Sequence, residues 1–326
     1  MKNLDILIIF IKIFGIFIFT GFGFNLLFLP KKLKELSFFL SPIIGLILII
    51  VSSGILSFGR VSLNIGSYVI VLISILLFFY ALIFGVSMRI FLKHAISFSL
   101  IIGLTLFLFP FNNVDISNFQ GFEFFREHTV IDTHTFNRTF LQNFMEIGLA
   151  SPAIFMSIIL RENIQTILQV LPGVYLTFFF LSVFFPAKIL LKRNTKAYII
   201  LGFLYLLMWY QNFSTPLILF LTFVFFIFGL TYEHISSEAK VPLNLLLPTE
   251  YEVMMGLSLS AIASVFPYGF KVVAFSLVFL AIYMIMKKAS SNLNRGKDIN
   301  LFFAMCIKII FITVLLNPVI IGLVLR

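Results

Sequence analysis

The chain has 326 residues, of which 61% are hydrophobic and only 11% are charged, and its formal net charge is +10. This composition excludes a water-soluble domain and indicates a polytopic membrane protein. The basic residues lie mostly in short stretches between apolar runs, so they favour a role in orienting the chain in a membrane, with no nucleic-acid partner. The single cysteine, Cys306, excludes a disulfide framework and a cysteine metal site.

Apolar runs long enough to cross a bilayer recur from end to end, which predicts an all-α bundle of transmembrane helices. The first run is not followed by a cleavage pattern, so we expect it to be retained. The fourth, sixth and eighth of about ten expected spans are short for a full crossing. The expected spans are Leu4–Leu29, Phe38–Phe58, Tyr68–Met88, His94–Phe109, Ile167–Leu190, Ala197–Tyr210, Pro216–Tyr232, Val253–Phe266, Val272–Met286 and Leu301–Leu325.

Alternation of these spans divides the basic residues unequally between the two sides of the membrane. One side collects clusters such as Lys31–Lys34 and Lys188–Lys196, whereas the other side has isolated residues such as Arg60 and Lys271. By the positive-inside rule the richer side is cytoplasmic. We therefore expect a multi-pass protein of the plasma (inner) membrane, with both termini and the loop 111–150 on the extracytoplasmic side.

That loop divides the chain into three regions: four spans in 1–110, the loop and an amphipathic helix in 111–165, and six spans in 166–326. It holds five of the thirteen acidic residues and two of the four histidines. In residues 135–149 the apolar residues recur with the period of an α-helix, which places Phe136, Phe140, Phe144 and Ile147 on one face. We expect this helix to lie in the membrane interface and to end at Gly148, with Pro152 beginning the next segment.

Asp132 and His134 precede the amphipathic helix at the expected membrane–water boundary. A carboxylate beside a histidine suits the transfer of a group from a lipid-phosphate carrier to an acceptor hydroxyl. Asp132 is the candidate base, and His134 is its neighbour or a metal ligand. The candidate phosphate-binding residues on the same side are Arg126, His128, Arg138 and Arg161. The alternative is structural, because an Asp just before a helix is also typical of an N-cap, and the other residues fit a solvated loop.

Two lysines fall inside apolar runs, Lys12 in the first span and Lys308 in the last. Charges inside a membrane are candidates for function, but both lysines lie near enough to a span end to reach the surface. We identify no acidic partner for either on a span, which argues against an ion-coupled transporter. His94 and His234 are expected to be surface groups at cytoplasmic edges. Gly256, among serines, is typical of close helix packing.

Several segments resemble the GT-C superfamily of membrane glycosyltransferases. They are Asp132-Thr-His134 followed by the helix to Gly148, Gln169-Val-Leu-Pro172-Gly173-Val-Tyr175, Phe28-Leu29-Pro30 with its basic turn, Ser41-Pro42-Ile-Ile-Gly45-Leu, and Phe213-Ser214-Thr215-Pro216. The resemblance implies an enzyme that takes a sugar from a polyprenyl-phosphate carrier at the outer face. It places Asp132 at the active centre, with a divalent metal in some members. The chain departs from the family in having four spans before the loop and no adjacent acid pair, so it has extra N-terminal spans or is a reduced relative without activity.

Two classes of function therefore fit the sequence. The first is a membrane glycosyltransferase-like protein whose partners are membrane lipid and a polyprenyl-phosphate-linked sugar. The second is a non-catalytic membrane subunit that scaffolds a larger complex with a membrane protein partner, or carries lipid or substrate. A third class, a secondary transporter, is disfavoured because the sequence shows no convincing internal repeat.

Overall fold

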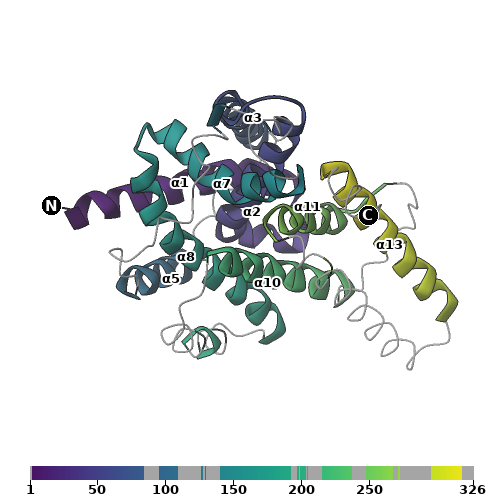
Figure 1. The fold of residues 1–326 in the computed structure, drawn as a ribbon. Coiled ribbons are helices and arrows are strands. Elements are labelled where there is room, and N and C mark those ends of the chain that lie inside the picture. The colour runs from purple at the N-terminus through teal and green to yellow at the C-terminus, as the bar shows by residue number, and fades with distance from the viewer. Residues whose placement is uncertain are drawn as a thin grey trace.

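The computed structural model of the chain describes residues 2–83, 95–108, 126–127, 129, 140–191, 197, 199–202, 204, 215–236, 247–266, 271 and 295–317. All secondary-structure elements in these ranges are helical (Figure 1). They are α1 (Lys2–Phe28), the 3₁₀ helix η1 (Lys31–Leu36), α2 (Ser37–Phe58), α3 (Leu63–Ile83), α5 (Ala95–Leu108), α7 (Phe140–Leu160), α8 (Ile164–Leu191), α10 (Thr215–Ser236), α11 (Glu250–Val265) and α13 (Arg295–Leu316).

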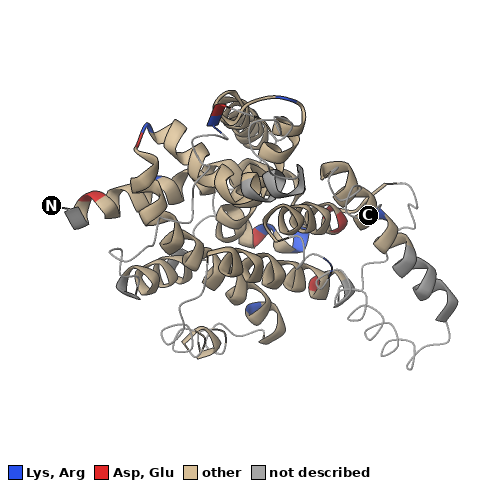
Figure 2. Ribbon diagram, in the orientation of Figure 1, with Lys and Arg blue, Asp and Glu red and all other residues tan. Residues whose placement is uncertain are grey.

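Five helical segments are long and apolar enough to cross a membrane: Leu4–Phe28, Lys31–Phe58, Leu63–Ile83, Ile164–Leu191 and Thr215–His234. Shorter apolar helices occupy Ser97–Leu106, Ile147–Leu160 and Ala304–Leu316. Charged residues occupy few positions along these helices (Figure 2). The all-α, membrane-spanning class expected from the sequence is thereby confirmed, while the number of ten spans stays a prediction. The expected span Val272–Met286 lies outside the described residues.

The outer faces of two helices are apolar and exposed, as expected for surfaces in contact with lipid. On α3 the side chains of Ile65, Leu72 and Leu76 are more than half exposed, and on α13 the same holds for Ile307 and Phe311. In water, continuous faces of this kind would mark an interaction surface or an aggregation site. Surrounded by acyl chains they need no protein partner, so they fit a multi-pass membrane protein.

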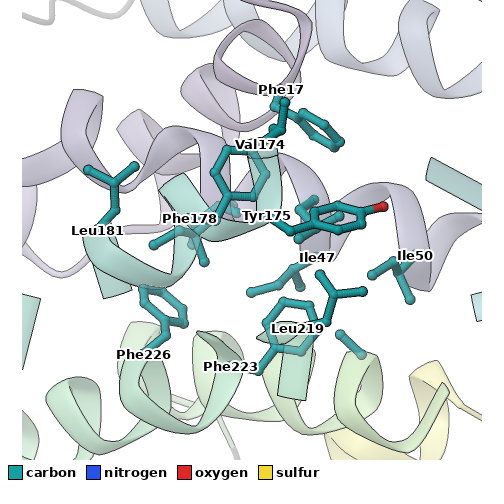
Figure 3. Packing of buried hydrophobic residues seen from close by; sticks show 14 of the residues in the cluster. Phe17, Ile47, Ile50, Val174, Tyr175, Phe178, Leu181, Leu219, Phe223 and Phe226 are labelled. Atoms are coloured by element: carbon teal, nitrogen blue, oxygen red, sulfur yellow. The ribbon is translucent and has the colours of Figure 1, made fainter. Parts of the chain in front are cut away.

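Phenylalanine side chains fill the interior where α1, α2, α8 and α10 meet (Figure 3). Phe178 of α8 packs edge-on against Phe17 of α1, with ring centroids 5.1 Å apart, and Phe185 lies 5.7 Å from Phe226 of α10. Such pairs add about 0.5–1.5 kcal/mol each beyond the burial of their area. Because lipid provides little hydrophobic drive between helices, close packing of this kind is what holds a membrane bundle together.

Glycines bring the first helices into backbone contact. A Cβ at Gly21 of α1 would overlap the carbonyl oxygen of Ser41 of α2, and one at Gly45 of α2 would overlap that of Phe17. On the other side of α1, a Cβ at Gly23 would lie 2.6 Å from the backbone nitrogen of Phe78 of α3. Only glycine permits helices to approach so closely. The contacts between α1 and α2 also show that these two helices run antiparallel.

Candidate functional site

The loop residues predicted to carry the chemistry fall mostly outside the described residues: this applies to Asp132, His134, His128 and Arg138. Two of the predicted phosphate-binding residues are described. Arg126 is exposed, and Arg161 is exposed in the turn between α7 and α8. The 21 residues of α7 rise about 31 Å at 1.5 Å per residue, and this helix separates Arg161 from the end of the loop. The roles of all six residues stay predictions.

The amphipathic helix does not end at Gly148, as the sequence suggested. Its described part belongs to α7, which continues through Pro152 to Leu160. Gly148 instead gives α7 close contact with α11, because a Cβ there would lie 2.7 Å from the carbonyl carbon of Ser264. From Ile147 onward α7 is part of the core, with Ile154 fully buried. The expected break is therefore wrong, and this half of the helix packs inside the protein.

The turn after α7 gives Lys12 an acidic partner. Arg161 adopts a left-handed conformation, with φ of 56°, in the position that commonly ends a helix. Asn163 then caps α8 by accepting a hydrogen bond from the backbone N–H of Gln165 at 2.9 Å. Between them, Glu162 lies 3.5 Å from the Lys12 ammonium nitrogen, with both side chains partly exposed. An exposed pair of this kind stabilises the fold by at most about 1 kcal/mol.

Lys308 also has an acidic partner, and this pair is buried. Its Nζ atom lies 3.4 Å from both Oε1 and Oε2 of Glu252. The Glu252 side chain is 4% exposed and that of Lys308 is 15% exposed. The sequence identifies no acidic partner for Lys308 on a span, and the structure provides one in the first turn of α11, one residue before the expected span Val253–Phe266. The sequence alone does not point to Glu252, because this residue precedes the apolar part of α11 and lies 56 positions from Lys308.

Glu252 is held in place by the start of its own helix. Thr249 and Glu252 form a capping box: the Glu252 N–H donates to Thr249 Oγ1 at 3.3 Å, and the Thr249 N–H donates to Glu252 Oε2 at 2.6 Å. The spacing of a threonine and a glutamate three residues apart before an apolar run is a recognisable signal in the sequence. The negative charge also lies at the helix N-terminus, where the helix dipole stabilises it.

An aromatic pair from α10 and α11 lies next to the ion pair. The rings of His234 and Tyr251 have centroids 4.9 Å apart. Both side chains are partly buried, so His234 packs against a neighbouring helix near the end of α10, and its expected place at the cytoplasmic edge stays a prediction. The Tyr251 hydroxyl is buried without a hydrogen-bond partner among the described residues. Burial raises the pKa of this hydroxyl, and the nearby carboxylates of Glu233 and Glu250 raise it further.

The junction of α10, α11 and α13 thus contains a closed charge pair, a histidine and a tyrosine. Both carboxylate oxygens of Glu252 are engaged by Lys308 and one also by the cap, so the pair fits a structural tie between helices better than an open binding site. Within the described ranges no group of three or more His, Cys, Asp or Glu residues could hold a metal ion. Comparison with family models, with curated proteins and with solved structures finds no match.

Proposed function

We propose that this chain is a membrane glycosyltransferase-like protein that transfers a sugar from a polyprenyl-phosphate carrier to an acceptor at the extracytoplasmic face of the plasma membrane. Its apolar helices support residence among lipids, where such a carrier is found. The acid-rich loop is where we place the active site, because it is the long polar stretch of an otherwise apolar sequence. The proposed topology places both termini and this loop outside the cytoplasm.

The anchoring of α7 is the observation that carries the proposal. This helix begins at Phe140, eight positions after Asp132, and its second half is buried against α2 and α11. Functional loops are typically positioned in this way by the packed elements that follow them. Asp132 and His134 come shortly before this packed helix in the sequence.

The proposed reaction uses Asp132 as general base. Asp132 takes the proton of the acceptor hydroxyl, the acceptor oxygen forms a bond to the anomeric carbon, and the bond from that carbon to the phosphate oxygen breaks. The lipid phosphate leaves with the electron pair of that bond. Arginines can neutralise its charge by bidentate hydrogen bonds, and the candidates for this role are Arg126 and Arg138. Arg161, the third candidate arginine, is less favoured because it lies about 31 Å along α7 from Phe140. His134 orients Asp132 or holds a divalent metal.

The test compares cells that carry the wild-type gene, Asp132→Asn, Asp115→Asn or no copy, at equal membrane levels of protein. Asp115 is the matched control, because it is an acid of the same loop farther from α7. We expect the null and Asp132→Asn to lose one surface glycan and to accumulate its lipid-linked precursor, while Asp115→Asn behaves as wild type. Loss of the glycan in the null together with normal glycan in Asp132→Asn would remove Asp132 from the catalytic role.

A non-catalytic membrane subunit is the second candidate. The observation in its favour is that Lys308 and Glu252 neutralise each other between helices, as expected of groups that hold a bundle together. Such a subunit would scaffold a complex or carry lipid or substrate. It predicts co-purification with a fixed membrane partner and tolerance of substitutions throughout the loop, including Asp132→Asn.

A further inference from the structure

Helices α11 and α13 run parallel, so their C-terminal ends lie side by side. Three contacts in register establish this: Glu252 with Lys308, Gly256 with Ile312, and the main chain of Ser260 with Asn317. The helices end at Val265 and Leu316. Each C-terminus carries the negative end of a helix dipole, equivalent to roughly half an electronic charge. Two such ends together favour a positive charge between them.

Buried oxygen atoms without partners lie at this meeting point. Asn317 is 1% exposed, and its Nδ2 donates to the Ser260 carbonyl at 3.1 Å and to Ser264 Oγ at 3.0 Å. Its Oδ1 atom has no hydrogen-bond partner among the described residues, and the same is true of Oγ of Ser260, which is fully buried. An unsatisfied buried polar group costs about 1–3 kcal/mol, so two such groups on residues that touch each other call for an occupant.

Helix α7 carries a third unpartnered oxygen one turn away from its own contact with Ser264. Its Gly148 packs on the backbone of Ser264, the residue that also accepts from Asn317. Ser151 follows three positions later and therefore lies on the same face of α7. Its Oγ atom is again buried without a partner in the described part of the chain. Within the described residues, neutral unpartnered oxygens thus occur on α11, on α7 and directly after α13, and these three segments are linked by the contacts of Ser264 with Gly148 and with Asn317.

We infer that this junction of α7, α11 and α13 binds a monovalent cation, sodium or potassium. The oxygens come from side-chain amide and hydroxyl groups, which suit an alkali cation, whereas divalent cations in proteins are bound chiefly by carboxylates. The helix dipoles disfavour an anion. Ends of helices and neutral oxygens bind sodium inside other membrane bundles by the same physics. The Glu252–Lys308 pair is remote from this junction, since Lys308 lies nine residues before Asn317, about 13 Å along α13.

A second buried asparagine shows why the helix ends matter. Asn25 is fully buried, donates to the Ser37 carbonyl and to Ser41 Oγ, and likewise has an unpartnered Oδ1. It joins the C-terminal end of α1 to the N-terminal end of α2, because these helices are antiparallel. The dipoles oppose each other there, so no net attraction for a cation results. Asn25 is therefore a matched control for Asn317.

The experiment measures the thermal unfolding of the purified full-length protein in detergent, in sodium, potassium or choline chloride at equal ionic strength. We expect the melting temperature to rise with the concentration of sodium or potassium relative to choline, because a ligand of the native state stabilises it. Asn317→Ala should abolish the rise, and Ser260→Ala should shift it to a concentration at least tenfold higher. Asn25→Ala should lower the melting temperature in every salt and keep the rise.

The three salts separate the outcomes. A rise in sodium alone or in potassium alone identifies the cation, and both results support the site. Equal melting temperatures of the wild type in all three salts would overturn it, since only water would then fill the junction. A rise that persists unchanged in Asn317→Ala and Ser260→Ala would also overturn it. If Asn317→Ala does not fold, Ser260→Ala decides alone. The inference does not depend on the proposed glycosyl transfer.

Discussion

The Glu252–Lys308 pair makes a quantitative prediction about single residues. Replacement of Lys308 by Met leaves Glu252 buried with an uncompensated charge, and breaking a buried pair in this way typically costs about 3–5 kcal/mol. The double variant Glu252→Gln/Lys308→Met removes both charges and should recover most of that loss. A double-mutant cycle of the free energy of unfolding in detergent measures the coupling. Additive effects of the two substitutions would show that the pair is not coupled in the folded protein.

The two intrahelical lysines show what a sequence reveals about individual residues and what it does not. The sequence identified Lys12 and Lys308 as unusual, because a charge inside an apolar run is costly. It did not reveal Glu162 or Glu252 as partners, since each is distant in the sequence from its lysine: Glu162 lies in the turn after α7 and Glu252 in the first turn of α11. Only the three-dimensional packing decides which helix faces which. Gly256 was identified correctly as a packing residue, and a Cβ there would lie 2.5 Å from Ile312.

The contact of α7 with α11 leads to a prediction about helices. Gly148→Ala should destabilise the protein by about 1–3 kcal/mol, because its Cβ would overlap the Ser264 backbone, and the two helices must separate to admit it. The matched control is Gly103→Ala in α5, where a Cβ meets nothing within 4 Å. That change should stabilise the helix by up to about 1 kcal/mol. Thermal unfolding of both variants in detergent tests the contact, and equal effects would argue against it.

The sequence predicts the bounds of a helix correctly where the helix is simply a long apolar run. Helices α1, α2, α8 and α10 lie close to the expected spans, because long apolar runs in lipid must form helices to satisfy their backbone groups. The sequence did not predict the end of α7. Gly148 and Pro152 are typical of helix boundaries, yet here the glycine permits close packing and the proline is accommodated within the helix. Tertiary contacts decided between these two uses of the same residues.

At the scale of the whole molecule, the parallel course of α11 and α13 bears on the topology. Two parallel helices place their first residues toward the same end of the protein, so Phe266, after α11, and Arg295, at the start of α13, lie toward opposite ends. This agrees with the expected span Val272–Met286, which lies outside the described residues. Helices α10 and α11 are antiparallel, as shown by the contacts of Thr231 with Met255 and of Phe220 with Phe266. This fits the expectation that consecutive spans cross the membrane in opposite directions.

The topology can be tested by labelling of single cysteines in intact cells, in a Cys306→Ser background that removes the native thiol. Leu247→Cys is exposed before α11, and Lys297→Cys lies in the first turn of α13. We expect a membrane-impermeant maleimide to leave both unlabelled until the membrane is opened, because the excess of basic residues predicts that this side is cytoplasmic. Thr133→Cys, in the acid-rich loop, should be labelled without opening. Labelling of only one of the positions 247 and 297 would contradict the parallel arrangement of α11 and α13. Labelling of both, together with protection of position 133, would show that the orientation is opposite to the predicted one and that the loop does not lie at the extracytoplasmic face.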